Sequence, residues 1–183
     1  MTVVPGPVRI RHPPSSPNHG RRVMRERPVG KSEKFHILVL HGPNLNLLGN
    51  REQAVYGNAS LRSINTAITK FAKREGISVA IRQSNVEGEL VSWIQQAKDR
   101  FHAIVFNPAG YTHTSVALRD AIAGVAIPTV EVHLSNIYKR EAFRHRSYIA
   151  GVALGQISGF GPTGYLLGIQ AAIDHLKTAR AGT

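Results

Sequence analysis

From His36 onward, the hydrophobic pattern of the chain alternates between short β-branched runs and segments with helical periodicity. β-branched runs favour strands, and apolar residues repeating every three to four positions favour helices with one buried face. The pattern predicts five strands, which are expected at residues 36–40, 77–82, 103–106, 129–133 and 148–157, the last interrupted by glycines. Alternating strands and helices are typical of βα units around a parallel sheet.

Four helices are expected between and after these strands. The first should begin after Ser60, a good N-cap residue, and end at Gly76. The third should begin near Thr114 and Ser115 and run to about residue 123, and the last should cover residues 163–179. Residues expected to face the sheet have apolar side chains at helical spacing: Leu61, Ile64, Ile68 and Phe71, then Leu90, Trp93, Ile94 and Ala97, then Val116, Ala117 and Ile122.

Five parallel strands joined by right-handed crossovers predict an α/β fold of flavodoxin-like type, with three layers and strand order 2-1-3-4-5. Ligands of such sheets bind beyond the carboxyl ends of the strands. The segments richest in polar chemistry follow the first, third and fourth strands, at residues 41–57, 107–114 and 133–147. We therefore expect these segments to converge on one edge of the sheet.

Charge and composition set the N-terminus apart from the rest of the chain. The 183 residues carry a formal net charge of +12, and residues 1–34 hold half of this excess and six of the ten prolines. Such a composition cannot bury enough apolar surface to order itself, so we predict a disordered extension before a catalytic domain at residues 35–183. A targeting segment and a polyanion-binding segment remain open alternatives for this extension.

Composition also limits the classes of partner. The chain has no cysteine, so it has no disulfide or thiolate metal site, and a reducing cytoplasm is the expected location. It has no apolar run near the roughly 20 residues that span a bilayer, so no membrane association is expected. Nucleic acid is also an unexpected partner, because the basic residues are not interleaved with aromatic residues and form no known binding motif.

Two segments carry candidate acid and base groups. Residues 41–57 form too long a connection for a tight turn, which suggests a lid containing Arg51 and Tyr56. Glu131 and His133 lie two residues apart at a strand end, hence on one face, where the carboxylate could fix the imidazole tautomer and favour its charged form. This arrangement would suit a histidine that donates a proton. Alternatively, Arg51 and Tyr56 are ordinary surface side chains, and His133 is an ordinary histidine at a strand edge.

Further polar groups follow the same strand ends. The backbone N–H groups of Leu134 and Ser135 could form an anion-binding nest after the fourth strand. Asn107 and His113 follow the third strand, and Arg144 lies in a charged stretch downstream. Without a role in a site, His113 would be an ordinary turn residue, and Arg144 would lie on an exposed helix face.

Three motifs, in this order, resemble the type II 3-dehydroquinate dehydratases over about residues 37–175: GPNLNLLGNRE followed by Tyr56, NPAGYTHTS followed by Asp120, and EVHLSNIYKREAFRHRSY. The resemblance implies a flavodoxin-like subunit, trimers assembled into a dodecamer, and no cofactor or metal. It also implies conversion of an anionic small molecule, 3-dehydroquinate, to 3-dehydroshikimate and water. This step serves both the shikimate pathway of aromatic amino acid biosynthesis and quinate catabolism, which the sequence does not separate.

The resemblance also implies a role for each candidate residue. An ordinary tyrosine has a pKa of about 10, so the base needs a cation such as Arg51 beside it. The resemblance implies that Tyr56 is the base, that Arg51 is the lid cation and that His133 is the acid, steadied by Glu131. Asn44 is implied to hold a water near the enolate, and Asn107, His113 and Arg144 are implied to contact substrate hydroxyls. Leu134 and Ser135 are implied to contact the carboxylate through the backbone, and Asp120 to contact a neighbouring subunit's site.

The chain departs from the family pattern at three positions without losing an implied catalytic group. His41 stands where Asn is more usual, Gln53 where Pro is common, and Arg146 where His is frequent. The main rival interpretation is a flavodoxin-like module that binds a small molecule without turnover. A Schiff-base dehydratase is disfavoured, because its barrel needs about 250 residues.

Overall fold

The computed structural model describes residues 34–49 and 59–182. These residues belong to one compact unit of the chain, residues 33–183. The predicted N-terminal extension, apart from Lys34, lies outside the described residues. So do Arg51, Gln53 and Tyr56 of the predicted lid.

The core of the domain is a five-stranded sheet with the order β2-β1-β3-β4-β5. Every neighbouring pair of strands is parallel, which confirms the predicted flavodoxin-like topology. The strands are β1 (His36–His41), β2 (Ser78–Gln83), β3 (Ala103–Asn107), β4 (Thr129–His133) and β5 (Gly155–Ser158).

In the described part of the chain, four α-helices connect or follow the strands: α2 (Leu61–Arg74), α3 (Glu87–Gln95), α4 (Val116–Val125) and α5 (Thr163–Ala181). Ser60 caps α2 as predicted, because its side chain accepts the backbone N–H of Ser63 while the Ser63 side chain accepts that of Ser60. Gly76 follows this helix with a φ of 69°, a left-handed conformation that glycine adopts without strain. Ser115 caps α4, because its side chain accepts the backbone N–H of Leu118.

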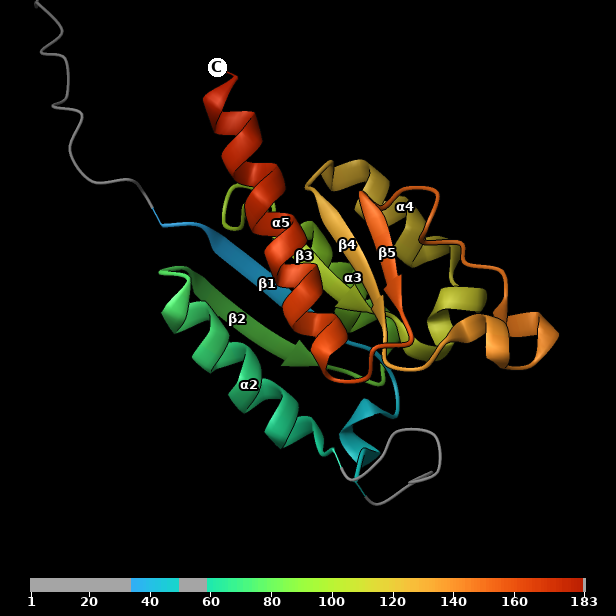
Figure 1. Ribbon diagram of the computed structural model, residues 1–183. Helices are drawn as coiled ribbons and strands as arrows, with labels where there is room; N and C mark the ends of the chain where they lie inside the picture. The colour runs from blue at the N-terminus through green and yellow to red at the C-terminus, as the bar shows by residue number, and fades with distance from the viewer. Residues whose placement is uncertain (1–33, 50–58, 183) are drawn as a thin grey trace, which may run out of the picture. The chain divides into compact units, whose positions relative to one another are not determined.

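The helices cover the two faces of the sheet in pairs (Figure 1). α2 and α5 pack on one face, where they meet Ile37 and Val39 of β1. α3 and α4 pack on the other face, where they meet Leu38 and Leu40 of the same strand. Side chains of a strand alternate between faces, so one apolar run supplies both layers of the core.

Two details of the sequence prediction are wrong. Val116 and Ala117 are exposed; α4 buries Ile122, as predicted, together with Leu118, which lies four residues earlier and one turn away against α3. The fifth strand is limited to Gly155–Ser158, because the backbone of residues 149–153 closes in a turn, with the Val152 and Ala153 N–H groups bonded to the carbonyl of Ile149.

Close backbone approaches need glycine at two positions near the strand ends. A Cβ atom on Gly42, just after β1, would lie 2.4 Å from the carbonyl oxygen of Pro108, just after β3. A Cβ atom on Gly168 of α5 would lie 2.9 Å from a methyl group of Val132. Glycine thus lets the first loop and α5 pack tightly around the carboxyl ends of β1, β3 and β4. Among the described residues, no helix has the length and apolar character needed to cross a membrane.

Candidate active site

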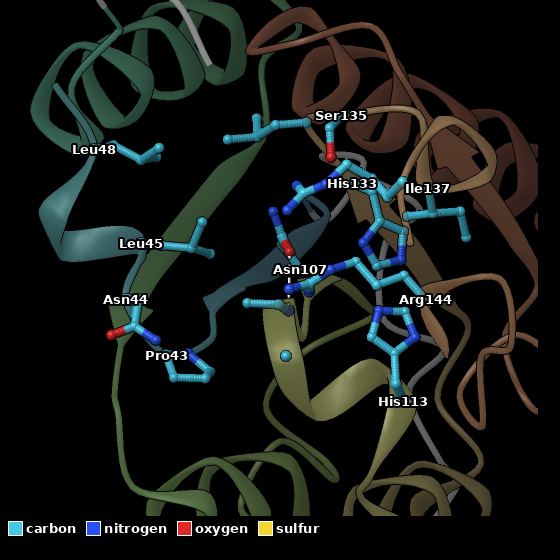
Figure 2. Close-up of a pocket in the computed structure, with 14 residues that line it drawn as sticks. Pro43, Asn44, Leu45, Leu48, Asn107, His113, His133, Ser135, Ile137 and Arg144 are labelled. Atoms are coloured by element: carbon cyan, nitrogen blue, oxygen red, sulfur yellow. Dashed lines mark hydrogen bonds between the residues drawn. The ribbon is translucent and has the colours of Figure 1, made fainter. Parts of the chain in front are cut away.

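A polar cavity of about 210 Å³ lies at the carboxyl ends of β1, β3 and β4 (Figure 2). Segments following these three strands contribute its walls, so the predicted convergence is confirmed for the described residues. Predicted site residues that line it are Asn44, Asn107, His113, His133, Leu134, Ser135 and Arg144. Figure 2 shows His133, His113 and Arg144 together on one side of the cavity and Asn44 with Leu45 on the opposite side.

His133 reaches the cavity from the last position of β4, and Glu131 lies two residues earlier on the same strand. The Nε2 atom of His133 is 2.7 Å from Oε1 of Glu131, and both side chains are almost completely buried. A carboxylate can only accept, so the ring donates its Nε2–H to Glu131 and keeps Nδ1 for other partners. The predicted carboxylate-held imidazole is therefore present, with Glu131 behind the cavity wall rather than in it.

Ser147 is a member of this group that the sequence analysis missed. Its Oγ donates to the Glu131 carboxylate, 2.8 Å from Oε1 and 3.0 Å from Oε2. The same Oγ accepts the backbone N–H groups of Ile149 and Ala150. Ser147 is 16 residues from Glu131, so only the position of its loop against β4 reveals this contact. A buried carboxylate is costly without partners, and Ser147 supplies one.

Asn107 enters the cavity from the end of β3, with a side chain that is 3% exposed. Its Oδ1 accepts the backbone N–H of Ala109 at 3.1 Å. Ala109 has a φ of 53°, in the left-handed region that costs a non-glycine residue on the order of 1 kcal/mol. The strained turn therefore directs a backbone donor at the Asn107 side chain.

His113 lies at the end of the short 3-10 helix Ala109–His113, which begins two residues after β3. Its Nδ1 is 2.7 Å from the carbonyl oxygen of Arg146, so Nδ1 carries the hydrogen and Nε2 is left as an acceptor. Burial lowers the pKa of His113 below its ordinary value, and the nearby His133 and Arg144 act in the same direction. His113 therefore offers the cavity a neutral imidazole.

Two arginines, Arg140 and Arg144, give the cavity a cationic wall. The Nε atom of Arg144 donates to Glu141 at 2.9 Å, and its guanidinium lies 4.9 Å from the centre of the Phe143 ring. The pKa of Glu141 is lowered, first by the hydrogen bond from its own backbone and then by Arg144 and Arg140. An ionised Glu141 thus helps to orient Arg144 toward the cavity.

Leu134 and Ser135 continue the chain from His133 along the cavity. Their carbonyl groups accept hydrogen bonds from residues that do not line the cavity: the Gly161 N–H donates to Leu134 at 2.8 Å, and the Ser158 hydroxyl donates to Ser135 at 3.0 Å. Asn44, on the opposite wall, has a left-handed φ of 66°, and its N–H donates to the side chain of Asn85. Asparagine tolerates this conformation better than most residues.

Among the site candidates in the described residues, Asp120 is the one that neither lines the cavity nor contacts a residue that lines it. It lies on α4 with 62% of its side chain exposed and pairs with Arg119 at 2.7 Å. The predicted base Tyr56 and lid cation Arg51 lie outside the described residues. Within residues 34–49 and 59–182, no group of three or more His, Asp or Glu side chains is placed to hold a metal ion.

This fold and cavity define an α/β protein of flavodoxin-like topology with a polar cavity at the carboxyl ends of its strands. The cavity combines a carboxylate-held histidine with a neutral histidine, an amide and a cationic wall. The comparisons with known proteins agree with this class. Residues 35–173 match the family model described as dehydroquinase class II.

Two curated relatives and a solved structure show how far the similarity extends. The chain is 57% identical over 143 residues to a 3-dehydroquinate dehydratase of Trichodesmium erythraeum, covering 78% of this chain and 95% of the relative. It is 60% identical over 145 residues to that of a Nostoc species, covering 79% and 99%. The crystal structure of a type II dehydroquinase from Butyrivibrio crossotus superimposes with a TM-score of 0.75 at 44% identity, covering 76% and 98%. The chain belongs to the class II dehydroquinase family.

Proposed function

We propose that this protein is a hydro-lyase that converts 3-dehydroquinate to 3-dehydroshikimate and water, without a cofactor. The observation that carries the proposal is the His133–Glu131 pair at a polar, cationic cavity. The relatives named 3-dehydroquinate dehydratase are matched over 95% and 99% of their own length. A binding module without turnover finds no support among these relatives.

The first chemical step is removal of a proton from the carbon beside the substrate ketone. The electron pair of the broken C–H bond moves into the carbonyl to give an enolate. We assign the base to Tyr56 as phenolate and its stabilisation to Arg51, on the strength of the sequence motif. Asn44, on the wall of the cavity, would hold a water that hydrogen-bonds the enolate oxygen.

The second step expels the hydroxyl group on the next carbon. The enolate collapses, a carbon–carbon double bond forms in conjugation with the ketone, and the C–O bond breaks. The departing oxygen needs a proton, which the imidazolium of His133 supplies. Because Nε2–H of His133 is committed to Glu131, the transferred proton comes from Nδ1. Glu131 holds the ring in place while its charge changes.

Substrate binding follows from the donors and acceptors around the cavity. Nε2 of neutral His113 can accept a substrate O–H, and Arg144 and Asn107 can donate to substrate oxygens. The backbone N–H groups of Leu134 and Ser135 are assigned to the carboxylate. The cationic wall favours an anionic substrate over a neutral analogue.

We further propose a homo-oligomer, a dodecamer of four trimers, in which Asp120 serves the site of a neighbouring subunit. The exposure of Asp120 on α4, away from its own cavity, supports this role. We also place the enzyme in the cytoplasm, which suits a chain without cysteine. Fractionation of the native cells would test that location.

The test of the reaction is an ultraviolet assay of purified protein mixed with 3-dehydroquinate. The product is a conjugated enone, so absorbance should rise with time and in proportion to enzyme. The His133→Ala variant, purified in the same way, controls for contaminating activity. An absorbance trace equal to that of the substrate alone would rule the proposed reaction out.

A further inference from the structure

The end of β2 lies beside the first loop of the cavity without lining it. Gln83, the last residue of β2, is next to His41, the last residue of β1, in the register of the two strands. Asn85 follows two residues later, and neither Gln83 nor Asn85 is on the cavity wall. Asn85 nevertheless contacts two segments that line the cavity, the loop after β1 and the 3-10 helix after β3. None of the proposed catalytic steps uses Gln83 or Asn85.

The side chain of Asn85 holds the backbone at Asn44. The Asn44 N–H donates to Oδ1 of Asn85 at 2.9 Å. Pro43 and Asn44 both line the cavity, and the peptide bond that joins them is planar, so this hydrogen bond fixes the plane from which the Asn44 side chain departs. The Asn44 carbonyl accepts the Leu47 N–H at 3.0 Å, which begins the 3-10 helix Leu45–Leu47. Asn85 therefore anchors the chain where it turns along the cavity wall (Figure 2).

The orientation of the two amides follows from their partners. A backbone N–H can only donate, so the Asn85 atom that faces Asn44 must be the oxygen. That oxygen can only accept, so the Gln83 atom 3.0 Å away must be the amide nitrogen, Nε2. The same nitrogen is 3.4 Å from the carbonyl oxygen of Gly42, which agrees with a donor at this position. Oδ1 of Asn85 thus accepts from two donors, and this position requires an acceptor.

The backbone of Asn85 is held by Tyr111. The Tyr111 side chain extends from the 3-10 helix Ala109–His113, and its hydroxyl donates to the Asn85 carbonyl at 2.8 Å. Gly110 and His113 of the same helix line the cavity. Asn85 therefore joins two wall segments, and a backbone that is itself fixed carries the side chain that holds Asn44.

We propose that Asn85 is a positioning residue for Asn44: its side-chain oxygen fixes the peptide between Pro43 and Asn44, and thereby the place of the Asn44 amide at the cavity. The proposal rests on the proposed function for the task of that amide, which is to hold the water that hydrogen-bonds the enolate oxygen. Within the described residues, the Asn44 side chain makes no hydrogen bond of its own, so the backbone decides where the amide lies.

The consequence is an effect on the chemical step more than on substrate binding. The enolate forms only after the substrate has bound, and its oxygen carries more negative charge than the ketone oxygen of the substrate. A displaced Asn44 amide would therefore weaken a contact that matters most in the transition state. Loss of the hold should lower kcat and change KM less.

The kinetic test compares two substitutions whose side chains are close to asparagine in size. Asn85 is exposed, so both variants should fold. Asn85→Leu removes the acceptor, and kcat for 3-dehydroquinate should fall by about three- to tenfold, the effect of one lost hydrogen bond. Asn85→Asp keeps an acceptor oxygen for both donors, so its kcat should stay within about twofold of the wild type.

Gln170→Leu is the matched control, because it also removes an amide that makes a hydrogen bond. The Gln170 side chain donates to Asp174 on α5 and is not on the cavity wall. Its kcat should stay within about twofold of the wild type. A wild-type kcat in Asn85→Leu, or an equal loss in Asn85→Leu and Asn85→Asp, would overturn the proposal.

A double-mutant cycle separates positioning of Asn44 from general support of the loop. In an Asn44→Ala background, Asn85→Leu should cause no further loss of kcat, because its effect passes through the missing amide. An equal kinetic loss in both backgrounds would show that Asn85 acts by another route, and would also overturn the proposal.

Hydrogen–deuterium exchange provides a readout that does not depend on turnover. On a peptide covering residues 41–48, followed by mass spectrometry, exchange of the Asn44 N–H should be about tenfold faster in Asn85→Leu and unchanged in Asn85→Asp. Equal exchange in the wild type and Asn85→Leu would contradict the inferred hold on the backbone. If the wild type failed to dehydrate 3-dehydroquinate but the variants showed this exchange pattern, the proposed function would fall while the hold of Asn85 on Asn44 would stand.

Discussion

The hydroxyl of Ser147 lies 2.8 Å from Oε1 of Glu131, the same oxygen that accepts the Nε2–H of His133 at 2.7 Å. Ser147 itself is held by two backbone N–H groups, those of Ile149 and Ala150. The loop after β4 thus fixes the serine, the serine fixes the carboxylate, and the carboxylate fixes the imidazole. Support of this kind orients a catalytic histidine without contact with the substrate.

Ser147→Ala should therefore lower kcat by about tenfold while KM changes less, since Glu131 would lose a donor and His133 would lose orientation. It should also reduce the unfolding free energy by about 1–3 kcal/mol, because a buried carboxylate loses a partner. Ser92→Ala is the matched control, since the Ser92 hydroxyl donates to the Gly88 carbonyl on the exposed side of α3. Steady-state kinetics and chemical denaturation measure both effects. A wild-type kcat in Ser147→Ala would show that Glu131 needs no such support.

His133→Ala should lower kcat by about 10² or more, because the departing hydroxyl loses its proton donor. The fold should persist, as judged by circular dichroism. His175→Ala, a change on the exposed side of α5, should leave kcat unaltered. Comparable losses in the two variants would indicate damage to the fold rather than loss of an acid.

Tyr56→Phe removes only the phenolic oxygen, and it should lower kcat by about 10² or more if Tyr56 is the base. Arg51→Ala should lower kcat and move the pH optimum upward, because a phenol without its cation has a higher pKa. Arg51→Lys should restore only part of the rate, since an ammonium lacks the planar guanidinium. A change in KM alone for Arg51→Ala, with no shift of the pH profile, would contradict this mechanism.

The pKa of His41, about 4 in the folded protein against an ordinary 6.5, links stability to pH. Between these values the unfolded chain binds the proton and the folded protein does not. Unfolding free energy should therefore be fully retained above pH 6.5 and decrease as pH falls toward 4, by about 3 kcal/mol for a shift of this size. His41→Asn, the residue more usual at this position in the resembling family, should show a weaker decrease. Denaturation curves with equal pH dependence for both proteins would contradict this prediction.

Asp120 provides a test of the proposed assembly. If it serves a neighbouring subunit, Asp120→Ala should reduce activity although Asp120 is outside its own cavity. Co-assembly of Asp120→Ala with His133→Ala subunits should then restore activity, because some sites receive an intact His133 from one subunit and an intact Asp120 from the next. Light scattering should show trimers or multiples of them. Fully active monomers at working concentrations would disprove the assembly.

The sequence by itself predicted the elements and their order. The β-branched runs placed β4 at residues 129–133, Ser60 and Gly76 marked the ends of α2, and the alternation of elements implied a parallel sheet. Local preferences decide these features, since capping, turns and hydrophobic periodicity act over a few residues. Glu131 and His133 were also accessible, because two residues apart on a strand means the same face.

Tertiary packing decided what lies around those elements. Val116 was expected to face inward, but the position of α4 against α3 selects Leu118 instead. Ser147 reaches Glu131 across 16 residues of sequence, and Tyr165 reaches His41 across 124. No local pattern marks such partners, because a buried polar group takes whichever donor or acceptor the packed elements bring within reach. The sequence thus determined which residues stand at the strand ends, and the fold determined which hydrogen bonds hold them there.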